Sequence, residues 1–247
     1  MWLLLWCALA GIVVPAAGKP LLWLPLGDSI TLGCGTDSPP HGADNCPADA
    51  GGYRVPTAWA LSQAGHNVTT MGTLRNGPAY VPAQWLSHGG HDGWRTDQVA
   101  AVLNASLATA LRPPDLVTIH LGTNDCYQGA SVELIKTRLT ALLSRLRVSA
   151  PEALVLVATI LHFPRNAPCV AAFNAALPSL VAAQRAAGWS KLVLVPMQEQ
   201  TGLCTTDAPL TDLCCHASMH PTAAGYLRMA SAWALAVAEN GQLHSAV

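Results

Sequence analysis

Three short motifs, far apart in the chain, contain residue types that together can hydrolyse an ester. They are Gly27-Asp28-Ser29, Gly122-Thr123-Asn124-Asp125 and His220-Pro221. A serine hydroxyl becomes a nucleophile when a base takes its proton, and the imidazole of His220 can act as that base for Ser29. The amide of Asn124 can donate a hydrogen bond to the oxyanion that forms during the attack. Each motif alone has ordinary turn composition, so the prediction depends on a fold that brings the three together.

Five short, nearly continuous apolar runs predict strands that are buried on both faces of a parallel sheet. They are Leu21–Leu26, Val68–Met71, Leu116–Leu121, Leu154–Leu161 and Leu192–Val195. Ser29 follows the first run and Asn124 follows the third. Ligands bind at the carboxyl ends of the strands in open parallel sheets, so both residues should lie at one edge, bordered by the irregular stretch Gly33–Gly52.

Helices are predicted between these runs because apolar residues recur there at helical spacing. The two clearest apolar faces consist of Val99, Val102, Leu103 and Leu107, and of Ile135, Leu139, Leu142, Leu143 and Leu146. Ser131 is the predicted N-cap of the second helix. Val170–Ala187 also has a helical pattern, which Pro178 should kink or split, and a last helix is expected over 223–238. The alternation predicts a single doubly wound α/β domain over residues 19–247.

The motifs resemble the SGNH/GDSL hydrolase superfamily, whose four marker positions correspond to Ser29, Gly72, Asn124 and His220. Further segments are similar to carbohydrate esterase family 3, the acetylxylan-esterase-like branch. These segments are Gly51-Gly52-Tyr53-Arg54, His88-Gly89-Gly90-His91-Asp92-Gly93-Trp94-Arg95 and Thr222-Ala223-Ala224-Gly225-Tyr226. Together the similarities cover the chain from about Leu21 to Ala238.

The resemblance implies a three-layer α/β/α, flavodoxin-like fold with a parallel sheet of about five strands. It also implies that Ser29 is the nucleophile and that His220 is the general base and then the general acid. The oxyanion hole would consist of the backbone N–H groups of Ser29 and Gly72 and the side-chain amide of Asn124.

The resemblance further implies that the substrate is an acetyl ester on a carbohydrate and that no cofactor or metal takes part. His88, His91 and Trp94 are candidates for substrate binding, and Trp94 could stack on the face of a sugar. Two other functions stay open. One is hydrolysis of lipid or small acyl esters, and the other is carbohydrate binding without catalysis.

One position departs from the family pattern. The family usually has an aspartate three residues before the histidine, and here that position is Ala217. In serine proteases, loss of the aspartate lowers the rate by about 10⁴-fold. Asp212, Asp207 or a backbone carbonyl could orient His220 instead, and we expect the carbonyl. Without any such group the protein would be a weak or inactive esterase.

A zinc site is an alternative interpretation of Cys214, Cys215, His216 and His220, since histidines four residues apart share a helical face. The spacing is crowded, however, and adjacent cysteines rarely both bind one metal. His88 and His91 could likewise be ligands, but their segment offers no carboxylate partner except Asp92. We therefore expect no metal in either place.

The composition limits the class of protein. Lys and Arg number 13 against 14 for Asp and Glu, so the formal net charge is −1, and 51% of the residues are hydrophobic. This composition excludes a disordered chain, and the near-zero charge argues against nucleic-acid binding, which needs a basic surface. We expect a monomer whose partner is a small ester or an acylated carbohydrate.

The N-terminal segment predicts secretion. Trp2–Val14 is an apolar run too short to span a bilayer comfortably, and Pro15-Ala16-Ala17-Gly18 suits cleavage by signal peptidase. Residues 1–18 are therefore the predicted signal peptide, with a membrane anchor or a buried first strand as alternatives. The mature protein would then be extracellular and would not insert into a membrane.

The cysteines agree with an oxidising compartment. Of the eight cysteines, Cys7 leaves with the signal peptide, and each of the others is expected in a loop after a predicted strand, on the catalytic edge. Cys34 is expected to pair with Cys46, and Cys204 with Cys214 or Cys215. Asn67-Val68-Thr69 and Asn104-Ala105-Ser106 are glycosylation sequons if the organism is eukaryotic.

Overall fold

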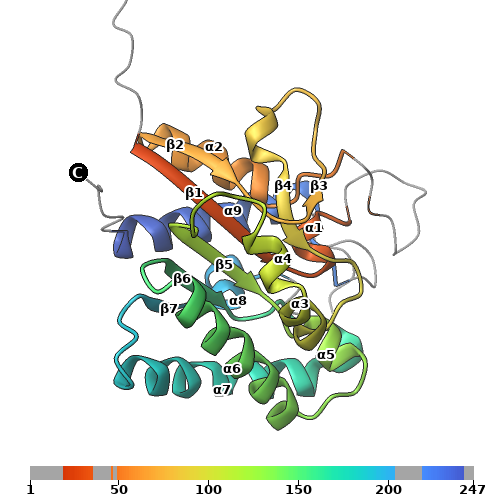
Figure 1. Ribbon diagram of the computed structural model, residues 1–247. Coiled ribbons are helices and arrows are strands. Elements are labelled where there is room, and N and C mark those ends of the chain that lie inside the picture. The colour runs from red at the N-terminus through yellow and green to blue at the C-terminus, as the bar shows by residue number, and fades with distance from the viewer. Residues whose placement is uncertain (1–18, 36–45, 47–48, 204–218, 242–247) are drawn as a thin grey trace, which may run out of the picture.

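A computed structural model describes residues 19–35, 46, 49–203 and 219–241 and has a mostly parallel sheet at its centre (Figure 1). The five predicted apolar runs all form strands of this sheet. They are β1 (Lys19–Gly27), β2 (His66–Thr70), β5 (Leu116–His120), β6 (Leu154–Ala158) and β7 (Leu192–Val195). These strands are parallel in the order β2-β1-β5-β6-β7, which is the flavodoxin-like order. The predicted fold class is confirmed.

Two further strands, which the sequence did not predict, extend the sheet beside β1. β3 (Leu74–Arg75) and β4 (Ser87–Gly90) form an antiparallel pair, and β4 runs parallel to the end of β1. The pairing of β2 with β1 ends at Trp23, and β4 then pairs with Leu26 and Gly27. β2 and β4 therefore occupy the same side of β1 in succession, and of these two strands β4 lies beside the end from which Ser29 follows.

Helices cover both faces of the sheet. One face carries α2 (Arg54–Gln63), α8 (Met197–Thr201) and α9 (Ala223–Asn240), and the other carries α3 (Thr96–Ala101), α4 (Leu103–Leu107), α6 (Val132–Ser149) and α7 (Ala167–Ala186). Short helices follow the strands: α1 (Ser29–Leu32), α5 (Thr123–Tyr127), η1 (Ala83–Trp85) and η2 (Pro164–Asn166). In β1, Leu22, Leu24 and Leu26 join the core on one face, whereas Leu21 and Trp23 join it on the other. Burial on both faces explains the continuous apolar run.

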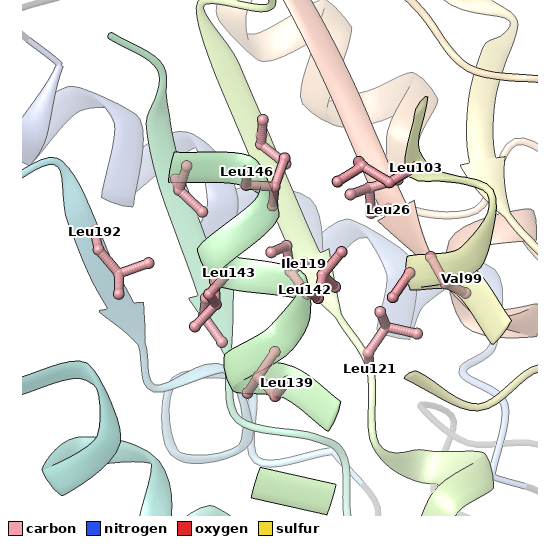
Figure 2. Packing of buried hydrophobic residues seen from close by; sticks show 14 of the residues in the cluster. Leu26, Val99, Leu103, Ile119, Leu121, Leu139, Leu142, Leu143, Leu146 and Leu192 are labelled. Carbon is pink, nitrogen blue, oxygen red and sulfur yellow. The ribbon is translucent and has the colours of Figure 1, made fainter. Parts of the chain in front are cut away.

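The core confirms the apolar face predicted for α6. Ile135, Leu139, Leu142, Leu143 and Leu146 are all buried against the sheet. Figure 2 shows the four leucines of this face. Each buried leucine stabilises the fold by about 1.5–3 kcal/mol relative to an exposed one. The predicted N-cap is also confirmed, because the Ser131 hydroxyl accepts a hydrogen bond from the backbone N–H of Leu134.

Two helix predictions need correction. The helix expected around Val99–Leu107 is two short helices, α3 and α4, separated at Val102, where ψ is 7°. α7 continues through Pro178 without a break. A proline inside a helix costs about 3 kcal/mol, and burial of one face of α7, formed by Val170, Phe173, Leu177 and Val181, offsets that cost. The segment Pro164–Ala186 is long and apolar enough to cross a membrane, but here its buried face belongs to the core.

Candidate active site

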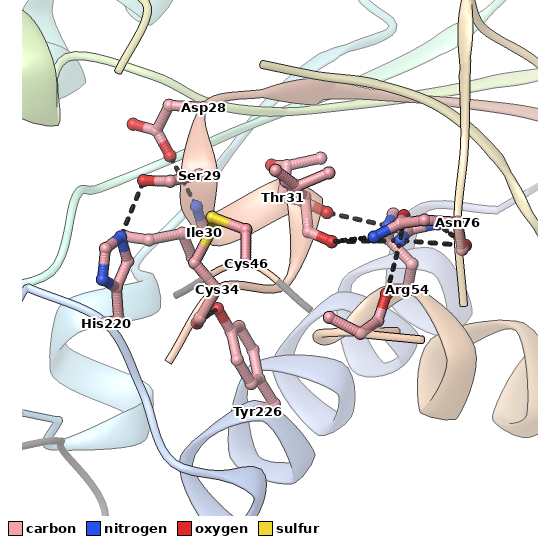
Figure 3. The surroundings of a disulfide bond; sticks show 12 residues. Asp28, Ser29, Ile30, Thr31, Cys34, Cys46, Arg54, Asn76, His220 and Tyr226 are labelled. Atoms are coloured by element: carbon pink, nitrogen blue, oxygen red, sulfur yellow. Dashed lines mark hydrogen bonds between the residues drawn. A yellow bond between two sulfur atoms is a disulfide. The ribbon is translucent and has the colours of Figure 1, made fainter. Parts of the chain in front are cut away.

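Ser29 and His220, which are 191 residues apart in sequence, are in direct contact (Figure 3). Ser29 is the first residue of α1, which begins immediately after β1, and His220 lies just before α9. The distance from Ser29 Oγ to His220 Nε2 is 2.8 Å. In this geometry Nε2 can accept the serine proton, provided that the ring proton of neutral His220 is on Nδ1.

The short segment after α1 packs against the histidine. A Cβ atom added to Gly35 would lie 2.3 Å from the Cβ atom of His220, so only glycine fits at position 35. The hydroxyl of Tyr226 in α9 donates to the carbonyl of Cys34 at 2.6 Å. Cys34 is also bonded to Cys46, which confirms the predicted disulfide. The bridge and the tyrosine thus anchor the segment that contacts His220 (Figure 3).

The groups proposed to orient His220 lie outside the described residues. These are Asp207 and Asp212, and Ala217 lies in the same part of the chain. The predicted bridge from Cys204 to Cys214 or Cys215 also falls there. The choice between a carboxylate and a backbone carbonyl therefore stays a prediction.

Asn124 reaches the same edge from the neighbouring strand. Gly27 of β1 is paired with His120 of β5, and Ser29 and Asn124 follow this pair by two and four residues. The Asn124 side chain is almost fully buried, and its Nδ2 donates to the carbonyl of Trp94 at 3.1 Å. A primary amide has two N–H bonds, so the contact with Trp94 leaves the second one for another acceptor.

Gly72, the remaining expected oxyanion donor, follows β2, and its role in the oxyanion hole stays a prediction. β2 ends beside Trp23, and the N–H of Gly72, just after β2, donates to Thr109 Oγ1 at 3.1 Å. The glycine beside the end of β1 is Gly90, which pairs with Gly27. A Cβ on Gly90 would lie 2.6 Å from the nitrogen of Leu32 in α1, so glycine allows the close approach of β4. The N–H of Gly90 itself donates to His88 Nδ1 at 3.1 Å.

The three candidate substrate-binding residues make contacts with the protein. His88 in β4 is fully buried, and burial lowers its pKa to about 2, so its ring is neutral. The ring of His91 stacks on the ring of Trp94, with centroids 4.0 Å apart and planes 12° apart. Trp94 also packs against the apolar core. His88 is thus inside the protein, and His91 covers one face of the Trp94 ring that was expected to stack on a sugar.

A buried arginine supports the helix that begins with Ser29. Arg54, at the start of α2, is fully buried, and among the described residues no carboxylate pairs with it. Its guanidinium donates to the carbonyls of Thr31, Leu32 and Ala50 at 2.7, 3.2 and 3.2 Å, and to Asn76 Oδ1 at 2.5 Å (Figure 3). Burial lowers its pKa to about 10, so it is charged at neutral pH. The Gly51–Arg54 motif marked this residue, but only the fold shows its partners.

A buried aspartate supports α5, the short helix that contains Asn124. Asp125 Oδ2 accepts hydrogen bonds from the N–H and the hydroxyl of Thr96 at 2.8 and 2.9 Å. Asp125 Oδ1 accepts from Arg138 of α6 at 2.7 Å. The carboxylate thereby joins α5 to α3 and α6. The motif contained this residue, yet nothing in the sequence identified Thr96 or Arg138 as its partners.

Asp28, immediately before the serine, is a second buried carboxyl group. Its Oδ1 accepts from the N–H of Ile30 at 3.0 Å and caps α1. Oδ2 has no hydrogen-bond partner among the described residues. Burial, which disfavours the charged form, raises the pKa of Asp28 to about 7.

Comparisons with known proteins agree with this geometry. Residues 26–228 match the GDSL-like lipase/acylhydrolase family. A family 3 carbohydrate esterase from Clostridium thermocellum is 26% identical, with a TM-score of 0.72 over 90% of this chain and 96% of that one. A family 3 carbohydrate esterase from Talaromyces cellulolyticus is 21% identical, with a TM-score of 0.66 over 89% and 97%, and shows the same fold. TesA also shares the fold, with 21% identity and a TM-score of 0.62 over 90% and 99%.

No protein of curated function matches the chain significantly. The family match nevertheless covers most of the sequence and includes Ser29, Asn124 and His220. The chain therefore belongs to the GDSL-like lipase/acylhydrolase family and is a carboxylic ester hydrolase.

Proposed function

We propose that this chain removes acetyl groups from carbohydrate through an acyl-enzyme on Ser29. The observation that carries the proposal is the 2.8 Å contact between Ser29 Oγ and His220 Nε2 at the carboxyl edge of the sheet. That contact favours a catalytic site over a binding module without catalysis, because it supplies the base that the serine requires.

The reaction follows from the placement of these groups. Ser29 Oγ attacks the ester carbonyl carbon while its proton passes to His220 Nε2. The Ser29 N–H, at the start of α1, and the second N–H of the Asn124 amide would stabilise the oxyanion. The bond from the carbonyl carbon to the sugar oxygen then breaks, and His220 returns the proton to that oxygen. In the second step His220 takes a proton from water, which attacks the acyl-serine. The bond from the carbonyl carbon to Ser29 Oγ then breaks, His220 returns the proton to Ser29 Oγ, and acetate is released.

The substrate class rests on the two family 3 carbohydrate esterases with this fold. A Clostridium thermocellum enzyme of that description shares 26% of its sequence over most of both chains. Acyl groups on carbohydrate are therefore the first substrates to test, and longer acyl chains are the comparison.

We place the enzyme outside the cell. The apolar run Trp2–Val14 followed by small residues supports a signal peptide, and two disulfides in the described part of the chain support an oxidising compartment. Residues 19–247 would then form the mature protein as a single domain.

Hydrolysis of p-nitrophenyl acetate by purified residues 19–247 tests the proposal, beside Ser29→Ala. We expect the variant to lose more than about 10³-fold in kcat with an unchanged circular dichroism spectrum. Ser144→Ala, at an exposed position in α6, is the matched control and should be fully active. Activity in Ser29→Ala equal to that of the control would exclude Ser29 as the nucleophile. Acetate release from acetylated xylan, compared with hydrolysis of a p-nitrophenyl ester of a long-chain acid, tests the substrate class.

A further inference from the structure

The side chains of α5 contact several different parts of the protein. Asn124 binds the backbone of Trp94, and Asp125 binds α3 and α6. The next two residues, Cys126 and Tyr127, contact α7 and η2. Figure 1 shows α5 beside the ends of α6 and α7. A helix of five residues is too short to be stable alone, so these contacts set its position.

The covalent contact is a disulfide from Cys126 to Cys169 in the first turn of α7. Its Cα–Cα distance is 5.6 Å, and Cys126 is fully buried. The prediction that every cysteine lies in a loop after a strand is wrong here, because both residues are helical. α7 also packs against Gly122, the residue just before α5, because a Cβ on Gly122 would lie 2.6 Å from the ring of Phe173 in α7.

The other contacts on this side of α5 are weaker. The Asn166 side-chain amide donates to the Cys126 carbonyl, and Arg165 donates to the Tyr127 hydroxyl at 3.0 Å. Arg165 and Tyr127 are both exposed, so water competes for that bond. The disulfide is therefore the strongest restraint on α5 from the side of α7.

We propose that the Cys126–Cys169 disulfide positions the Asn124 amide for oxyanion stabilisation. This inference rests on the proposed function, in which Asn124 is an oxyanion donor. Cys126 is two residues after Asn124 in the same helical turn, so a displacement of α5 at Cys126 also displaces the amide. Oxyanion stabilisation needs donors that are fixed before the reaction, and a misplacement of about 1 Å can cost about 10²-fold in rate.

The first variant is Cys126→Ala combined with Cys169→Ala. We expect kcat for p-nitrophenyl acetate to fall between about tenfold and about 10²-fold, while KM stays unchanged, because the oxyanion exists only beyond the ground state. Complete loss of one oxyanion donor costs about 10²–10³-fold, so Asn124→Ala sets the upper limit. In an Asn124→Ala background, removal of the disulfide should therefore cost no further activity.

That double-mutant cycle separates positioning from general stability. If the disulfide only stabilised the fold, its removal would lower the melting temperature and leave kcat per folded molecule unchanged, with or without Asn124. Val181→Ala is the control for this case. It removes buried volume from α7 far along the helix from Cys169, so it should lower the melting temperature without changing kcat. Cys169→Ser is the second variant if the double variant does not fold, because it keeps Cys126 as a buried thiol.

A second measurement does not depend on activity. The side-chain amide signals of Asn124 in a ¹⁵N–¹H NMR spectrum, assigned by their loss in Asn124→Ala, should shift or broaden without the disulfide and be unchanged in Val181→Ala. Unchanged amide signals in the disulfide-free protein would overturn the positioning role even if no ester were cleaved. Failure of the wild type to hydrolyse any ester would overturn the proposed function separately. A loss of kcat that adds to that of Asn124→Ala would also refute the inference.

Discussion

Replacing Arg54 by lysine keeps a positive charge but removes the planar set of N–H donors that binds the helix of Ser29. Arg54 uses Nε for the carbonyl of Thr31 and Nη2 for Leu32, Ala50 and Asn76. Lysine has three donors on one nitrogen, and that single nitrogen cannot reach acceptors on both sides of the former guanidinium. We expect Arg54→Lys to leave up to two buried oxygens, the carbonyls of Thr31 and Ala50, without a donor.

The cost follows from the number of unsatisfied groups. A buried acceptor that loses its donor costs about 1–3 kcal/mol, so two such acceptors lower the free energy of unfolding by about 2–6 kcal/mol. A typical domain has only about 5–15 kcal/mol of stability, so this is a large share of the total. Because Thr31 and Leu32 belong to the same short helix as Ser29, we also expect kcat to fall.

Urea unfolding at pH 7 measures the effect as a lower transition midpoint with an unchanged m-value. Arg185→Lys is the matched control, since Arg185 also donates to backbone carbonyls, at 2.9 and 2.8 Å, but is exposed. Water can replace the lost donors there, so the control should change stability by less than about 1 kcal/mol. An equal loss in the free energy of unfolding for the two variants would refute the reasoning, because the buried bonds of Arg54 would then contribute no more than the exposed bonds of Arg185.

Two further predictions concern titration and the orientation of the histidine. The pKa of Asp28 is raised in the folded protein to about 7 from an ordinary value of 3.8, so between pH 5 and 7 the folded state holds a proton that the unfolded state has lost. Because of Asp28, the free energy of unfolding should therefore fall by about 2–3 kcal/mol as pH rises across that range. In urea unfolding, Asp28→Asn should remove this dependence on pH. A variant with the same dependence on pH as the wild type would contradict the raised pKa. If a backbone carbonyl orients His220, Asp212→Asn and Asp207→Asn should both keep nearly full kcat in steady-state assays. A fall in kcat of several orders of magnitude in Asp212→Asn alone would show instead that Asp212 orients the histidine.

The sequence by itself determined the parallel sheet and the place of Ser29 and Asn124 within it. Apolar runs such as Leu116–Leu121 become strands because burial on both faces requires a continuous apolar pattern. Ser29 and Asn124 follow two such runs, so the parallel topology alone places them at one edge. The spacing of α6 and the cysteines around Gly33–Gly52 were equally informative, because helix faces and short disulfide loops depend mainly on local sequence.

Only the tertiary structure decided which strand lies beside Ser29. β4 has the sequence Ser-His-Gly-Gly, which has no apolar or β-branched pattern, and it is a strand because it pairs with β1 and β3. The fold also decided three features that depend on residues far apart in the sequence. They are the disulfide from Cys126 to Cys169, the contacts of Arg54, and the burial that keeps α7 continuous through Pro178. Local periodicity records how deeply a residue is buried, whereas the identity of its partner depends on how distant segments pack together.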